Sequence, residues 1–214
     1  MSIYKDYVKE TVDENGSLVD IEISYPDNFN FGYDVLDRIA RETPDKRALV
    51  WCNTKNEEHI FSFEDIRREG NKVANVFLSA GIRKGDKVMV VLKKHYEYWF
   101  VAMALCKIGA VMIPVTHMLT ENDFRYRFSC VEVKGIVATP DNDVTDNVSK
   151  ALQGASFSPI LWTVQRSKDG WRNLSEEKEK EGDQIPRFEN KATDPMLLYF
   201  TSGTTGYPKG VIHD

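Results

Sequence analysis

Lys87-Val-Met-Val-Val-Leu92 is the stretch that decides the fold, together with the mostly apolar residues 95–108 and with Ala110-Val-Met-Ile-Pro-Val115. The first and last segments are apolar runs of strand length, whereas residues 95–108 have the length and composition of a helix. Strands that show continuous apolar runs are typical of a sheet covered on both faces. The three segments therefore predict a strand–helix–strand unit inside a buried, parallel sheet.

The same alternation continues in both directions along the chain. On the N-terminal side we expect a helix, two short strands and a second helix, over residues 33–42, 47–52, 58–63 and 62–79. The second helix opens with Ser62-Phe-Glu-Asp65, which has the form of a capping box, and Gly81 closes it. On the C-terminal side we expect helix, strand, helix and strand, over residues 120–130, 135–139, 143–152 and 160–164. The prediction is an α/β domain with a mostly parallel sheet flanked by helices.

A run of charged residues, Glu176–Asp183, then interrupts the apolar pattern. Charges of both signs at close spacing predict a solvated helix or a surface excursion, and an interaction tail is the alternative. The apolar run Met196–Phe200 follows and predicts a further strand.

The composition excludes several classes of protein. The chain has 214 residues, with 28 Lys and Arg against 33 Asp and Glu, so its formal net charge is −5. This acidic balance argues against nucleic-acid binding, which usually requires a basic excess. The three cysteines are widely spaced, and without a CxxC pair they support neither a zinc ribbon nor a disulfide framework. We expect buried, reduced thiols.

No segment of the sequence predicts a membrane span. The most apolar stretch, residues 99–115, is interrupted by Lys107 and contains Gly109 and Pro114. It is therefore too short and too broken to cross a bilayer. The N-terminal residues lack the apolar core of a secretory signal, and the expected location is the cytoplasm.

The segment Thr201-Ser-Gly-Thr-Thr-Gly-Tyr-Pro-Lys-Gly210 carries the chemistry. Its glycines allow close backbone approach, its backbone N–H groups and hydroxyls can bond an oligophosphate, and Lys209 adds a mobile positive charge. It departs from the Walker pattern because Pro208 precedes the lysine and an apparent strand follows it. We predict a strand–loop–strand phosphate site, the alternative being a surface hairpin rich in glycine and threonine.

Residues 199–210 resemble the signature loop of the adenylate-forming (AMP-binding) superfamily, which includes acyl-CoA synthetases, luciferases and peptide-synthetase adenylation domains. Other segments are similar to conserved stretches of that family, namely 61–66, 85–88, 104–114 and 119–120. The opening residues 29–37 resemble the acetyl- and medium-chain acyl-CoA synthetase branch more than the luciferase branch. The similarity covers about residues 28 to 214.

The resemblance implies a two-step reaction. A carboxylate attacks the α-phosphate of ATP, with Mg²⁺, to give an acyl-adenylate and pyrophosphate, and the thiol of coenzyme A then displaces AMP. The family loop holds the β- and γ-phosphates. By position, the ATP phosphate-binding residues are Thr201, Ser202, Gly203, Thr204, Thr205, Gly206 and Lys209.

The resemblance also implies that residues 1–214 are the N-terminal portion of an AMP-binding domain, with the phosphate-binding loop at 201–210. The remainder of the large domain and the small C-terminal domain have no counterpart, so we expect a truncated chain that is inactive by itself. No catalytic residue and no metal ligand is assigned. His213 is either a residue of the acyl pocket or a strand residue with a satisfied hydrogen bond.

Two alternatives to an acyl-CoA synthetase stay open at this point. The acceptor of the acyl group could be the phosphopantetheine arm of a carrier protein, or the chain could be a non-catalytic nucleotide- or phosphate-binding module. The sequence identifies neither the acid nor the oligomeric state.

Overall fold

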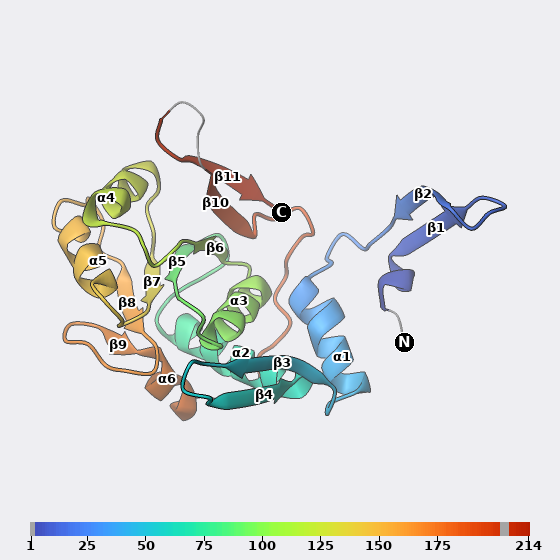
Figure 1. Ribbon diagram of the computed structural model, residues 1–214, viewed down its shortest axis with the longest axis horizontal. Coiled ribbons are helices and arrows are strands. Elements are labelled where there is room, and N and C mark those ends of the chain that lie inside the picture. The colour runs from blue at the N-terminus through green and yellow to red at the C-terminus, as the bar shows by residue number, and fades with distance from the viewer. Residues whose placement is uncertain (1–2, 202–205) are drawn as a thin grey trace.

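The computed structural model describes residues 3–201 and 206–214 of the chain. The main strands are β5 (Lys87–Val91), β6 (Val111–Pro114), β7 (Gly135–Ala138), β8 (Ile160–Thr163), β9 (Arg172–Asn173), β10 (Leu197–Thr201) and β11 (Lys209–His213). They form one seven-stranded sheet in the order β11-β10-β6-β5-β7-β8-β9 (Figure 1). Every neighbouring pair is parallel except β10 and β11, which are antiparallel. The predicted mostly parallel sheet is therefore confirmed.

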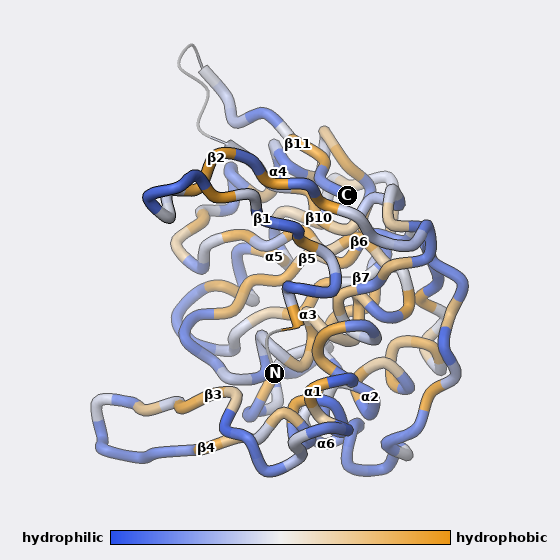
Figure 2. Tube along the Cα trace, turned by 90° about the vertical axis from the view of Figure 1, so that its right-hand side faces the viewer, coloured by the Kyte–Doolittle hydropathy of each residue, from blue (hydrophilic) through white to orange (hydrophobic). Residues whose placement is uncertain are grey.

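Helices cover both faces of this sheet. One face is covered by α2 (Phe63–Ser79) and α3 (Glu97–Ile108), and the other by α4 (Glu121–Cys130) and α5 (Val144–Leu152). The central strand β5 serves both cores, because Val88 and Val90 pack with α2 and α3 whereas Met89 and Val91 pack with α4 and α5. None of these four side chains is more than 1% exposed. Figure 2 shows the resulting concentration of hydrophobic residues inside the molecule.

The N-terminal region differs from the prediction in its details. The first helix begins earlier than expected, as a π-helical segment over Phe31–Leu36 that continues into α1 (Asp37–Glu42). It begins there because the Asn30 side chain accepts a hydrogen bond from the Gly32 N–H and caps the segment. A short 3-10 helix, Ile3–Asp6, and an antiparallel hairpin of β1 (Val8–Val12) and β2 (Leu18–Ile23) precede it and were not predicted.

The expected hairpin and capped helix are confirmed. Strands β3 (Arg47–Cys52) and β4 (Glu58–Ser62) are antiparallel neighbours and lead directly into α2. The Ser62 hydroxyl accepts the Asp65 N–H at 3.1 Å, and the Asp65 carboxylate accepts the Ser62 N–H at 2.8 Å. This reciprocal capping box satisfies two backbone donors at the start of α2.

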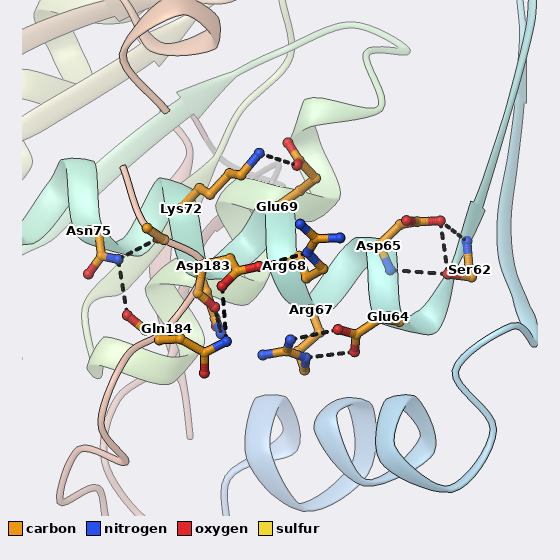
Figure 3. A network of polar contacts seen from close by, with 12 residues as sticks. Ser62, Glu64, Asp65, Arg67, Arg68, Glu69, Lys72, Asn75, Asp183 and Gln184 are labelled. Carbon is orange, nitrogen blue, oxygen red and sulfur yellow. Dashed lines mark hydrogen bonds and ion pairs between the residues drawn. The ribbon is translucent and has the colours of Figure 1, made fainter. Parts of the chain in front are cut away.

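The charged run is only partly solvated. It contains the end of α6 (Leu174–Glu177) and a 3-10 turn over Lys178–Lys180, and it lies against α2 (Figure 3). Arg68 on α2 contacts Asp183 at 2.7 Å, and the Asn75 amide donates to the carbonyl oxygen of Gly182 at 2.7 Å. Lys178 is only 9% exposed and pairs with Glu69. The run therefore packs against α2, because its charged side chains pair with opposite charges on α2 and its backbone carbonyl group accepts a hydrogen bond from Asn75.

The cysteine prediction was wrong at two of three positions. Cys106 is buried in α3, whereas Cys52 and Cys130 are exposed. Both exposed thiols stand at the last residue of an element, Cys52 at the end of β3 and Cys130 at the end of α4. Of the helices in the described part of the chain, none has the length and apolar character needed to cross a membrane.

A buried ion pair joins the helices of one face. Lys107 on α3 is fully buried, and its Nζ donates to Asp37 Oδ1 at 2.6 Å and to Asn71 Oδ1 at 2.8 Å. Burial lowers the pKa of Lys107, and the Asp37 carboxylate opposes that effect. This contact explains why a lysine interrupts the most apolar stretch of the sequence.

We predict that Lys107→Met destabilises the protein by about 3–5 kcal/mol, because it leaves the Asp37 carboxylate buried without its cation. Urea denaturation measures this loss. The double variant Lys107→Met/Asp37→Asn should regain part of it, since the uncompensated charge is then gone. A double variant as unstable as the single one would contradict this explanation.

His95 follows β5 and lies against the end of β7. Its Nε2 is 3.0 Å from the Thr139 hydroxyl oxygen, and the ring is half-buried. Burial lowers the pKa of His95 and the nearby Asp141 opposes that shift. The folded state therefore binds fewer protons at this residue than the unfolded state does.

It follows that the His95 contribution to stability is lost as the pH falls below about 6.5 and is recovered as the pH rises through that range. The variant His95→Gln cannot titrate. We therefore predict that its free energy of unfolding changes less steeply with pH between about 5 and 7 than that of the unmodified protein. Denaturant unfolding across this range provides the measurement, and equal slopes would contradict the prediction.

Candidate functional site

The order of the strands in the sheet reverses at β5. From β5 the chain passes through α3 to β6 on one side, and from β6 through α4 to β7 on the other side of β5. Ligands of open α/β sheets bind outside the carboxyl ends of the strands at such a reversal. Strand β10 is parallel to β6, with Leu197 opposite Met112, so its carboxyl end lies at this same edge. The glycine-rich loop starts there, at Thr201.

The structure brings the two ends of the predicted phosphate loop together. Thr201 ends β10 and pairs with Lys209, which begins β11. The Thr201 hydroxyl lies 3.4 Å from the carbonyl oxygen of Lys209, to which it donates. Gly206 adopts a positive φ of 142°, a backbone conformation that favours glycine. The strand–loop–strand arrangement is thus confirmed at both ends, with the exposed Lys209 side chain at the loop base.

Four of the predicted phosphate-binding residues lie outside the described part of the chain. They are Ser202, Gly203, Thr204 and Thr205. Their role stays a prediction from the sequence.

A group of charged residues lines the same edge of the sheet. Lys93, after β5, has its Nζ 3.6 Å from Asp141, which follows β7. Arg166, after β8, also pairs with Asp141. Two cations thus surround one carboxylate, and positive charge at this edge favours the approach of an anion. Sequence analysis missed these residues because three separate strand ends bring them together.

His213 does not join the loop residues. It ends β11 and stands opposite Leu197 at the start of β10, four positions from the Thr201–Lys209 pair. At strand spacing this corresponds to about 13 Å. The exposed imidazole packs edge-on against Tyr199, with 5.7 Å between ring centroids. A role of His213 in an acyl pocket stays a prediction.

Sequence analysis also missed two residues of α4 that contact the loop, Tyr126 and Arg127. Tyr126 contacts Tyr207 and Pro208 in the C-terminal part of the loop, and Arg127 contacts Phe200 in β10, immediately before the loop. More than 70 positions separate these partners along the chain, so no local pattern indicates the contacts.

Comparisons with known proteins agree with this geometry. Residues 36–214 match the family model described as AMP-binding enzyme. Acyl-coenzyme A synthetase ACSM5, mitochondrial, of Homo sapiens is 36% identical in an alignment of 194 positions, which covers 88% of this chain and 33% of that protein. Acyl-coenzyme A synthetase ACSM3, mitochondrial, of Mus musculus is 34% identical in an alignment of 221 positions, which covers 99% of this chain and 38% of that protein.

A solved structure shows the same fold. The luciferase-like enzyme from the nonluminescent mealworm Zophobas morio superimposes with a TM-score of 0.75 at 19% identity, over 89% of this chain and 44% of that enzyme. The chain spans little more than a third of the curated relatives it matches. The family match over residues 36–214 confirms the resemblance inferred from the loop, and the chain belongs to the AMP-binding enzyme family.

Proposed function

We propose that this chain supplies the triphosphate-binding part of an ATP-dependent, AMP-forming acyl-CoA synthetase. The observation that carries the proposal is the position of loop 201–210, which leaves β10 at the carboxyl edge beside the strand-order reversal. Membership of the AMP-binding family and the similarity to acyl-CoA synthetases support it. The substrates would be a carboxylic acid, ATP and coenzyme A.

In this proposal the residues of the chain bind and orient ATP. The Thr201 hydroxyl, the backbone N–H groups of the glycine-rich segment and the Lys209 ammonium would hold the β- and γ-phosphates. A carboxylate then attacks the α-phosphorus, forming a P–O bond to the acid as the bond to pyrophosphate breaks. The coenzyme A thiol, losing its proton, next displaces AMP from the acyl carbon. Holding the pyrophosphate charge favours the first of these two steps.

Mg²⁺ would be held mainly through the nucleotide itself. Within residues 3–201 and 206–214, no group of three or more His, Cys, Asp or Glu side chains could hold a metal ion. The sequence of the loop offers hydroxyl groups and a lysine, and Mg²⁺ commonly binds through substrate phosphates with few protein ligands. When bound, the ion neutralises phosphate charge.

The location of the protein is a separate question. The cytoplasmic location expected from the sequence stays a prediction, and the two relatives described above are named as mitochondrial proteins.

We predict that the full-length protein catalyses ATP–pyrophosphate exchange that depends on one class of carboxylic acid. A panel of short, medium-chain, branched and aryl acids identifies that class. The isolated 214-residue chain is the control and should give no exchange, because it spans only 33–38% of its relatives. Exchange by the isolated chain would contradict its inactivity, and a full-length protein inert with every acid would contradict the ligase.

We further predict that Lys209→Ala slows adenylation by about 10- to 100-fold, because it removes a cation from the proposed triphosphate site. The second half-reaction, thioester formation from supplied acyl-adenylate, should change less than about threefold. Single-turnover measurements of both half-reactions make the comparison.

The matched control is Lys150→Ala, which removes an exposed lysine at the end of α5. It should leave both half-reactions unchanged. Equal loss of both half-reactions in the Lys209 variant would argue against a role of the loop in the first step.

A further inference from the structure

Two consecutive residues of α4 contact the C-terminal part of the glycine-rich loop and the strand that leads into it; these two segments are called the arms of the loop below. Tyr126 contacts the C-terminal arm, which contains Tyr207 and Pro208, and Arg127 contacts the N-terminal arm at Phe200. Figure 1 shows α4 beside the β10–β11 hairpin from which the loop extends. One helix turn therefore touches the chain on both sides of the predicted phosphate-binding residues.

The Tyr126 contact combines a hydrogen bond with ring stacking. The phenol donates to the carbonyl oxygen of Pro208 at 2.9 Å. The rings of Tyr126 and Tyr207 are stacked, with 4.6 Å between centroids and 20° between planes. A phenol is protonated at neutral pH, and the neighbouring Cys130 thiol raises the pKa of Tyr126 further. Pro208 immediately precedes Lys209, and fixing its carbonyl group also fixes the start of the lysine.

Arg127 of α4 contacts the N-terminal arm through its buried guanidinium group. The guanidinium carbon lies 5.1 Å from the centre of the Phe200 ring, and Arg127 is 7% exposed. Its Nη1 donates to the carbonyl oxygen of Asp123 at 2.9 Å, whereas its Nε is buried without a hydrogen-bond partner among the described residues. An arginine buried in this way is held chiefly by the aromatic face, which attracts a desolvated cation.

Helix α4 is itself firmly held. A capping box of Thr120 and Asp123 fixes its first turn, and Phe124 and Phe128 pack in the core under the sheet. Arg125 donates to the carbonyl oxygen of Lys150 at 2.8 Å and so joins α4 to α5. The loop arms therefore contact a helix, α4, whose position is fixed by its packing in the core.

We propose that Tyr126 is a positioning residue for the phosphate loop: α4, through Tyr126 on one arm and Arg127 on the other, sets the placement of Lys209. The kinetic consequence of this inference rests on the proposed function, because it assumes that Lys209 faces the triphosphate of ATP. The contacts themselves do not depend on that assumption.

The test compares Tyr126→Leu, Tyr126→Phe and Tyr207→Leu in the full-length protein. Tyr126→Leu removes both the hydrogen bond and the stacking, and we expect about a tenfold rise in KM for ATP in pyrophosphate exchange. Tyr126→Phe keeps the ring and should show a smaller rise. Thioester formation from supplied acyl-adenylate should be spared in all three variants. The control is Asn122→Ala, an exposed position of the same helix.

A second readout does not require activity. Amide hydrogen exchange of a peptide covering residues 206–211 should become several-fold faster in Tyr126→Leu, relative to a peptide covering β5. Tyr207→Leu removes only the stacking and should have a smaller effect. The double variant should add little to Tyr126→Leu, because that variant already removes the shared contact.

Two results would overturn the inference. One is unchanged hydrogen exchange at 206–211 together with an unchanged KM for ATP. The other is an equal loss of both half-reactions with a lowered Tm in the leucine and phenylalanine variants, which would make Tyr126 merely structural. If the unmodified protein is inert with every acid, the proposed function fails, and hydrogen exchange alone then decides whether Tyr126 holds the loop.

Discussion

The double burial of β5 is the constraint on which the rest of the structure depends. Val88 and Val90 need an apolar cover on one face, and Met89 and Val91 need one on the other. A strand can satisfy both only if helices lie on both sides of the sheet, and parallel neighbours with helical crossovers provide that arrangement. The chain must then add strands on both sides of β5. The reversal of strand order at β5 is therefore a consequence of packing, and the loop after β10 begins at the carboxyl edge of the sheet.

The parts of the fold that could be predicted from the sequence are those set by local chemistry. The strands at 87–92 and 135–139 could be recognised because a strand that is buried on both faces has apolar residues on both. Its sequence is then a continuous apolar run. The capping box at Ser62 could be located because both of its partners lie within four residues. The loop at 201–210 was equally local, since its glycines, hydroxyls and lysine are contiguous.

What escaped prediction depends on contacts between distant segments. The exposure of Cys52 follows from the exposure of most of β3, and that of Cys130 from its place at the end of α4; composition reveals neither. The burial of Lys178 depends on Glu69, more than a hundred positions away. The β1–β2 hairpin was missed because its strands are exposed along their length, with Ile23 64% exposed, so they lack the apolar run of a buried strand. The contact of Tyr126 with Pro208 belongs to the same class of distant pairings.

A strand–loop–strand phosphate site imposes a physical requirement that a Walker site does not. In a Walker loop the following helix points its N-terminal N–H groups and dipole at the phosphates, so the helix both attracts and fixes the anion. Here an antiparallel strand follows the loop, and a sheet edge contributes only a small dipole. Side chains and the loop backbone must then provide the attraction, and something outside the loop must fix its geometry. Helix α4 meets that second requirement, because two of its adjacent residues contact the loop arms while its apolar face is anchored in the core. In the proposed site, the loop would bind the anion and the neighbouring helix would hold the loop in place.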